Sequence, residues 1–109
     1  MTEPFHYVAD LSQLTTELPE ESILSRNVYG DDHVKVTLFG FAPGQELSEH
    51  TAARPAILHF LDGEAELVLG EETKPARAGT WVRMDAHLPH SIRAQTPVQM
   101  LLILLPGSD

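Results

Sequence analysis

Short stretches of alternating apolar and polar residues, each closed by glycine or proline, are the feature that most constrains the fold of this chain. Residues 34–38 and 65–69 alternate with a period of two, which is typical of a half-buried β-strand. Pro43-Gly44, Asp62-Gly63 and Thr96-Pro97 mark turns between such segments. Many short strands at this spacing predict an all-β fold, either a sandwich or a barrel.

Only one segment favours a helix. Between residues 10 and 18 leucines recur at spacings of three and four, Asp10 is a candidate cap, and Pro19 closes the segment. We therefore expect at most one short helix, near the N-terminus. Asp62-Gly63 predicts a hairpin that returns the strand at 56–61. We expect a single domain over 1–109, with an N-terminal extension and edge strands at 1–32 and a barrel at 33–105.

The chain carries seven basic and sixteen acidic residues, a formal net charge of −9. Nucleic acids and anionic membrane surfaces bind through lysine and arginine, so neither is an expected partner. Cysteine is absent, which excludes disulfides and thiolate ligands. No signal-peptide pattern opens the chain, and its longest apolar run, 100–105, is too short to cross a bilayer. A cytoplasmic location is the expectation.

The last predicted strand, 98–105, is apolar on both of its faces. Alternation would leave three large side chains of 100–105 facing water in an isolated monomer. Either a second sheet or a second subunit has to cover them. Of the two, we favour a homodimer.

Two histidines in separate predicted strands are the strongest candidates for chemistry. His50 follows the Pro43-Gly44 turn, and His90 follows Pro89 about forty residues later. Imidazole is the commonest side-chain metal ligand, so two rings that converge in one interior would be a natural start for a metal site. Without a metal, the same two polar groups in an apolar pocket would form a binding site for a small molecule.

These elements together resemble the cupin family, and in particular its small single-domain members. The first cupin motif is a glycine, five residues, His-x-His, three or four residues, Glu, six residues and Gly; Gly44, His50 and Gly63 match it. The second motif is a glycine, five residues, Pro-x-Gly, two residues, His, three residues and Asn; Gly79 and His90 match it. Other motif positions differ, and they hold Ala52, Ala56, Asp85, His87 and Ala94. The resemblance covers about residues 33–105 and implies a double-stranded β-helix, or jelly-roll barrel, that is usually dimeric.

Cupins with complete motifs hold Mn, Fe, Ni, Cu or Zn on three histidines and one glutamate. Carried over by position, His50 and His90 remain candidate ligands, whereas Ala52 and Ala56 cannot coordinate a metal. Metal sites normally offer at least three protein ligands, so a third one is needed. His87, on the approach to His90, is the candidate, and the alternative is a solvent-facing loop histidine.

Two functions remain open. The first is a cupin that binds a divalent transition metal, a small organic ligand, or both, inside the barrel. The alternative is a non-catalytic, metal-free protein that binds or senses a small molecule. Arg54 is either an anchor for an anionic ligand or a solvated loop residue. No residue is assigned as catalytic, the reaction is unassigned, and whether the protein is an enzyme stays undecided.

Overall fold

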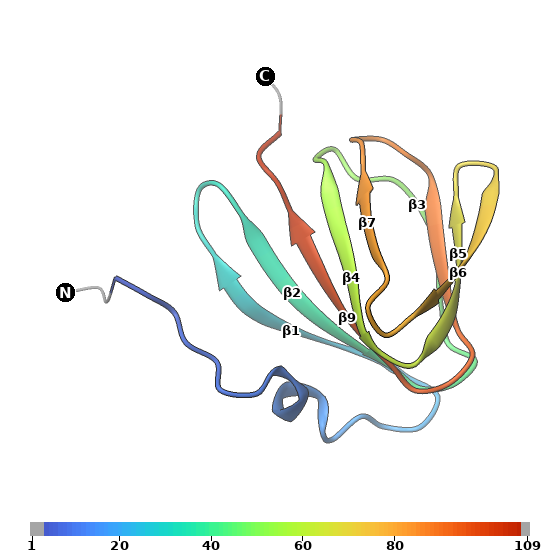
Figure 1. Ribbon diagram of the computed structural model, residues 1–109, viewed down its shortest axis with the longest axis horizontal. Coiled ribbons are helices and arrows are strands. Elements are labelled where there is room, and N and C mark those ends of the chain that lie inside the picture. The colour runs from blue at the N-terminus through green and yellow to red at the C-terminus, as the bar shows by residue number, and fades with distance from the viewer. Residues whose placement is uncertain (1–3, 108–109) are drawn as a thin grey trace.

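The computed structural model describes residues 4–107, and within them nine β-strands form two sheets (Figure 1). The strands are β1 (Ile23–Gly30), β2 (Lys35–Phe41), β3 (Glu46–His50), β4 (Ala56–Asp62), β5 (Glu64–Leu69), β6 (Glu72–Arg77), β7 (Trp81–Met84), β8 (His90–Ala94) and β9 (Val98–Leu104). The fold class predicted from the sequence is confirmed. None of the helices described is long and apolar enough to span a bilayer.

All strand pairs are antiparallel. One sheet has the order β1-β2-β9-β4-β7, and the other has the order β3-β8-β5-β6. The chain crosses repeatedly from one sheet to the other, so strands that are neighbours in sequence often lie in different sheets. This winding is that of a jelly-roll, in which a single core lies between the two sheets.

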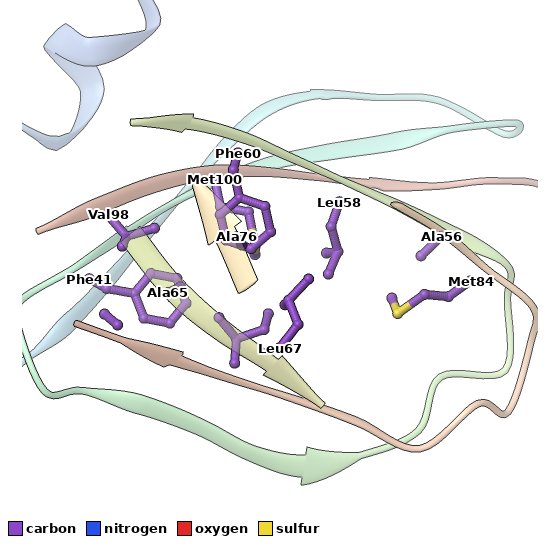
Figure 2. Packing of buried hydrophobic residues seen from close by; sticks show 12 residues of the cluster. Phe41, Ala56, Leu58, Phe60, Ala65, Leu67, Ala76, Met84, Val98 and Met100 are labelled. Carbon is purple, nitrogen blue, oxygen red and sulfur yellow. The ribbon is translucent and has the colours of Figure 1, made fainter. Parts of the chain in front are cut away.

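The core consists of apolar side chains that alternate along the strands and point between the sheets (Figure 2). Large side chains such as Phe41 and Phe60 gather toward one end of the barrel, and both are fully buried. Ala56 and Met84 lie toward the opposite end, where they are direct partners across β4 and β7. The barrel is therefore packed with aromatic rings at one end and with smaller or flexible side chains at the other.

The prediction of a hairpin at Asp62-Gly63 is wrong. β4 pairs with β7 and β9, whereas β5 pairs with β6 and β8, so Gly63 carries the chain from one sheet to the other. Gly63 has a φ of 89°, and a Cβ atom at this position would lie 2.0 Å from the carbonyl oxygen of Pro97. The turn residues were read correctly, but turn chemistry does not decide which strands pair across a turn.

The predicted N-terminal helix is a single 3-10 helix, η1 (Leu11–Thr15), capped by the Asp10 side chain, which accepts a hydrogen bond from the Ser12 backbone amide. Thr15 is buried against Gly40 of β2, where an added Cβ would approach the threonine side chain to 3.1 Å. The Gln99 side chain of β9 donates a hydrogen bond to the Thr15 hydroxyl. The N-terminal segment thereby covers part of the outer face of the five-stranded sheet.

Candidate functional site

His50 and His90 face each other at the end of the barrel where Ala56 and Met84 lie. His50 is the last residue of β3 and His90 the first of β8, and the two are direct partners in the antiparallel pairing of these strands. Their ring centroids are 4.2 Å apart, and the ring planes are inclined by 57°. The structure therefore brings together the two histidines on which the sequence-based hypothesis depends.

Each ring is oriented by its own backbone. Nδ1 of His50 lies 2.8 Å from the carbonyl oxygen of Ser48, and Nδ1 of His90 lies 2.8 Å from that of Leu88. A carbonyl oxygen only accepts hydrogen bonds, so Nδ1 is the protonated nitrogen in both rings. When such a ring is neutral, its lone pair is then on Nε2. A backbone bond to the other ring nitrogen is the usual way in which proteins orient a metal-binding histidine.

The two rings differ in exposure. His90 is 6% exposed, while His50 is exposed. Burial lowers the pKa of the His90 imidazole; the hydrogen bond to the Leu88 carbonyl acts in the opposite direction, and the nearby His50 adds to the lowering. His90 is therefore neutral at pH 7, the form that can donate its lone pair to a metal or accept a hydrogen bond from a ligand.

Small and apolar residues lie at this end of the barrel. Ala56 is buried and lies between Met84 of β7 and Leu104 of β9, while Leu69 of β5 is the second strand partner of His90. The loop that joins β3 to β4 contains Ala52, whose carbonyl oxygen accepts a hydrogen bond from the His87 amide. A methyl group occupies both positions at which the cupin motif has a ligand, so these positions supply no donor atom.

His87 lies on the exposed loop before β8. Its φ is 68°, a left-handed conformation that is uncommon for residues other than glycine. Across residues 4–107, no three histidine, aspartate, glutamate or cysteine side chains are grouped closely enough to hold an ion. The role of His87 as a third ligand stays a prediction.

Arg54 is half-buried, and its guanidinium is bound to backbone carbonyls. Its Nε donates a hydrogen bond of 2.6 Å to the carbonyl of Leu105, and its Nη2 donates to the carbonyls of His33 and Leu104. The guanidinium therefore joins the β1–β2 turn to the end of β9. It is a structural tie, and no pattern in the sequence pointed to the backbone carbonyls that it binds.

The comparisons with known proteins agree with this fold. Residues 37–104 match the cupin domain family. A cupin superfamily protein from Desulfitobacterium hafniense shares 27% identity over 95% of this chain and 94% of its own, with a TM-score of 0.84. A conserved protein of unknown function from Streptococcus pyogenes shares 28% identity over 100% and 98%, with a TM-score of 0.78.

A third similar structure is a cupin 2 conserved barrel domain protein from Leptotrichia buccalis. It shares 29% identity over 87% of this chain and 46% of its own, with a TM-score of 0.78. No curated protein matches the chain. These similarities concern the barrel as a whole, so the chemistry of the site has to be argued from its own residues.

Proposed function

The chain belongs to the cupin domain family, and on this premise we propose that His50 and His90 hold one divalent transition metal, whose coordination is completed by water and a small organic ligand. The observation that carries the proposal is the orientation of the two rings. They are 4.2 Å apart, and both use Nδ1 for a backbone carbonyl, which leaves Nε2 available in each.

The donor set fits a metal held by two neutral imidazoles. Imidazole suits Zn, Cu, Ni and Fe, whereas Mn and Mg favour carboxylate oxygens. The motif position for the glutamate is Ala56, so the hard oxygen donor is missing. Copper, nickel and zinc are therefore the preferred ions, with copper the tightest according to the general order of divalent affinities.

A two-histidine site leaves several coordination positions for a ligand from solution. An ion bound there supplies Lewis-acid polarisation of a carbonyl or carboxylate group. The chain itself contributes the orientation of the imidazoles, through the Ser48 and Leu88 carbonyls. The apolar residues around this end, such as Met84 and Leu69, favour a compact organic ligand with few polar groups.

Metal content tests the proposal. Protein purified without chelator and without a histidine tag is dialysed separately against Mn, Fe, Co, Ni, Cu and Zn, and the bound metal is measured by elemental analysis. We expect close to one ion per chain for copper or zinc and its loss in His50→Ala and in His90→Ala. His33→Ala, which removes an exposed histidine from a turn, is the matched control and should retain the metal.

Two further results are informative. His87→Gly suits the left-handed backbone at this position, so a loss of metal in this variant would identify His87 as the third ligand. Metal content far below one per chain with every ion would contradict the proposal. It would favour the alternative, a metal-free barrel that binds a small molecule through the same two imidazoles.

A further inference from the structure

A hollow of about 430 Å³ lies beside the turn that joins β1 to β2 (Figure 1). The residues that line it come from the end of β1, the turn, the start of β2 and the loop between β3 and β4, and they include Asn27, Tyr29, Gly30, Asp31, Lys35 and Arg54. Its volume is in the range of binding sites for small molecules. No histidine lines this hollow, so it is separate from the histidine pair.

Two positive charges meet at this hollow, on Lys35 and Arg54. The formal net charge of the chain is −9, with sixteen acidic residues against seven basic ones. Both ion pairs formed by lysine or arginine within residues 4–107 lie elsewhere, one on β6 and one beside β7. Two basic side chains without an ionic partner in an acidic protein favour an anion from solution.

The backbone holds the Arg54 guanidinium in one place. Nε donates a hydrogen bond to the carbonyl of Leu105, and Nη2 donates to the carbonyls of His33 and Leu104, whereas Nη1 has no partner within residues 4–107. No buried side-chain nitrogen or oxygen of this range lacks a partner, so Nη1 is accessible to solvent. Because the guanidinium is already ordered, a ligand that binds Nη1 loses little free energy in positioning it.

Lys35 lies beside the same guanidinium. It is the direct partner of Leu104 across β2 and β9, and the Leu104 carbonyl is 3.4 Å from Nη2 of Arg54. Direct partners point to the same face of a sheet, and the Leu104 side chain packs against the core, so Lys35 leaves the inner face of this sheet. Its ammonium is a flexible donor that can bind the same group as Nη1.

Gly30 leaves room beside Lys35. It is the partner of Lys35 on β1, and a Cβ atom added to it would meet nothing within 4 Å. The φ of Gly30 lies outside the left-handed region, so the backbone itself does not require a glycine here. A side chain at this position would point to the same face as Lys35 and would fill the hollow.

The Asp31 carboxylate, which also lines the hollow, is already engaged. Its Oδ1 accepts hydrogen bonds from the backbone amides of His33 and Val34, and its Oδ2 accepts one from the Tyr29 hydroxyl. These bonds lower the pKa of Asp31, with the His33 amide as the largest cause. Asp31 is therefore ionised at pH 7, and two positive charges against one negative charge suit a monoanion better than a polyanion.

We propose that this hollow binds a small organic carboxylate, whose oxygens accept hydrogen bonds from Nη1 of Arg54 and Nζ of Lys35. The apolar part of such a ligand would lie against Val28 and Tyr29, which also line the hollow. The geometry favours a carboxylate because it offers two acceptor oxygens and one charge. The proposal does not depend on a metal at the histidine pair, so either proposal can fail without the other.

Nuclear magnetic resonance of the metal-free, nitrogen-15-labelled protein tests the proposal with benzoate as the probe. We expect saturable shifts of the Gly30 and Lys35 amides and of the Arg54 Nε–H signal at constant ionic strength. Benzamide, which has the same ring without the charge, should bind at least about tenfold more weakly. Tighter binding of inorganic phosphate than of benzoate, or no saturable shift with benzoate, would overturn the proposal.

Three variants separate the hollow from the general charge of the surface. Lys35→Gln should weaken benzoate binding by about tenfold, because one charged donor is lost. Gly30→Val keeps both charges, suits a β-strand and should abolish the saturable shifts by filling the hollow. Lys74→Gln, on β6 of the other sheet, is the matched control and should bind benzoate like the unmodified chain.

Urea denaturation of each variant shows that it is folded before its binding is compared. An equal loss of benzoate binding in Lys35→Gln and in Lys74→Gln would mean that only the overall charge matters, and would overturn the proposal. Unchanged binding in a folded Gly30→Val protein would overturn it as well, because the ligand would then lie outside the hollow.

Discussion

His50 and His90 are direct partners across β3 and β8 with opposite exposures, the first open to solvent and the second buried. The His50 ring therefore lies at the surface of the barrel, and the His90 ring is packed inside it. Both rings present Nε2 with the other nitrogen bound to the backbone, so both can serve one ion. Their contributions to stability should nevertheless differ.

We predict that His90→Ala destabilises the fold by about 1–3 kcal/mol, because it leaves a cavity and removes the partner of the Leu88 carbonyl. His50→Ala should change the free energy of unfolding by about 0.5 kcal/mol or less, as for other exposed positions. Urea denaturation of the two variants, without metal, measures both values. Equal costs would show that the rings are equally buried in solution.

The stability of the metal-free protein should fall in acid. Burial lowers the pKa of His90 in the folded state, whereas in the unfolded chain it takes the ordinary value of 6.5. Above pH 6.5 both states are neutral at this residue and its contribution to stability is complete. As the pH falls below 6.5 the unfolded state binds a proton first, so the folded state loses stability until its own pKa is reached.

Urea denaturation between pH 8 and pH 5 checks this dependence. His90→Asn lacks a titrating group at this position, and its stability should fall less over the same interval. The difference between the two proteins isolates His90 from the carboxylates of this acidic chain. A parallel decrease in both proteins would assign the acid sensitivity to other groups.

Two glycines with similar backbone conformations allow the cost of backbone strain to be measured separately from the cost of steric crowding. Gly63 and Gly79 have φ values of 89° and 96°, but a Cβ at Gly63 would meet the Pro97 carbonyl at 2.0 Å, whereas nothing lies within 4 Å of one at Gly79. Gly79→Ala should cost about 1–2 kcal/mol from backbone strain alone. Gly63→Ala should lower the free energy of unfolding by clearly more, because the added methyl group would also meet the Pro97 carbonyl where the chain crosses between the sheets.

Thermal and urea denaturation of both alanine variants measure these costs. Similar values for the two variants would mean that the approach of Gly63 to Pro97 is looser in solution than in the structure. The comparison therefore tests the path of the chain between β4 and β5, which is the part of the fold that the sequence predicted wrongly.

Arg54 should contribute to stability through its bonds to backbone carbonyls. Arg54→Met keeps an apolar stem and removes the donors to Leu105, His33 and Leu104. We expect a loss of about 1–3 kcal/mol by chemical denaturation, because charged donors to half-buried carbonyls are stronger than neutral ones. Arg77→Met, at an exposed position of β6, is the control and should change stability little.

Much of the fold followed from period-two alternation and from turn residues, because these are local signals. Which strands pair with each other depends on contacts between distant parts of the chain, so local signals did not predict it. The Asp62-Gly63 turn was recognised, yet its strands belong to different sheets. Residues 34–38 predicted a half-buried strand, but Leu38 on its outer face is fully buried, since the N-terminal segment covers part of that face of the sheet. The alternation of apolar and polar residues within a strand does not show whether a distant segment of the chain covers its outer face.

The site was predicted in part. His50 and His90 were found because both cupin motifs retain a histidine at the same place. The bonds from these rings to Ser48 and Leu88 were not foreseen, because backbone carbonyls carry no sequence identity. The bonds of Arg54 to backbone carbonyls were not foreseen for the same reason. Side chains that bind other side chains can be inferred from residue types, but those that bind the main chain require coordinates.

Imidazole nitrogen spectra test the central claim most directly. Two-bond proton–nitrogen correlations of the uniformly labelled protein at pH 7.5 report the tautomer of each histidine, and Zn²⁺ is then added in steps. We predict that His50 and His90 are both protonated on Nδ1 and that both Nε2 resonances shift together, saturating at one zinc per chain. Protonation of either ring on Nε2, or a titration that leaves both resonances unmoved, would contradict the account.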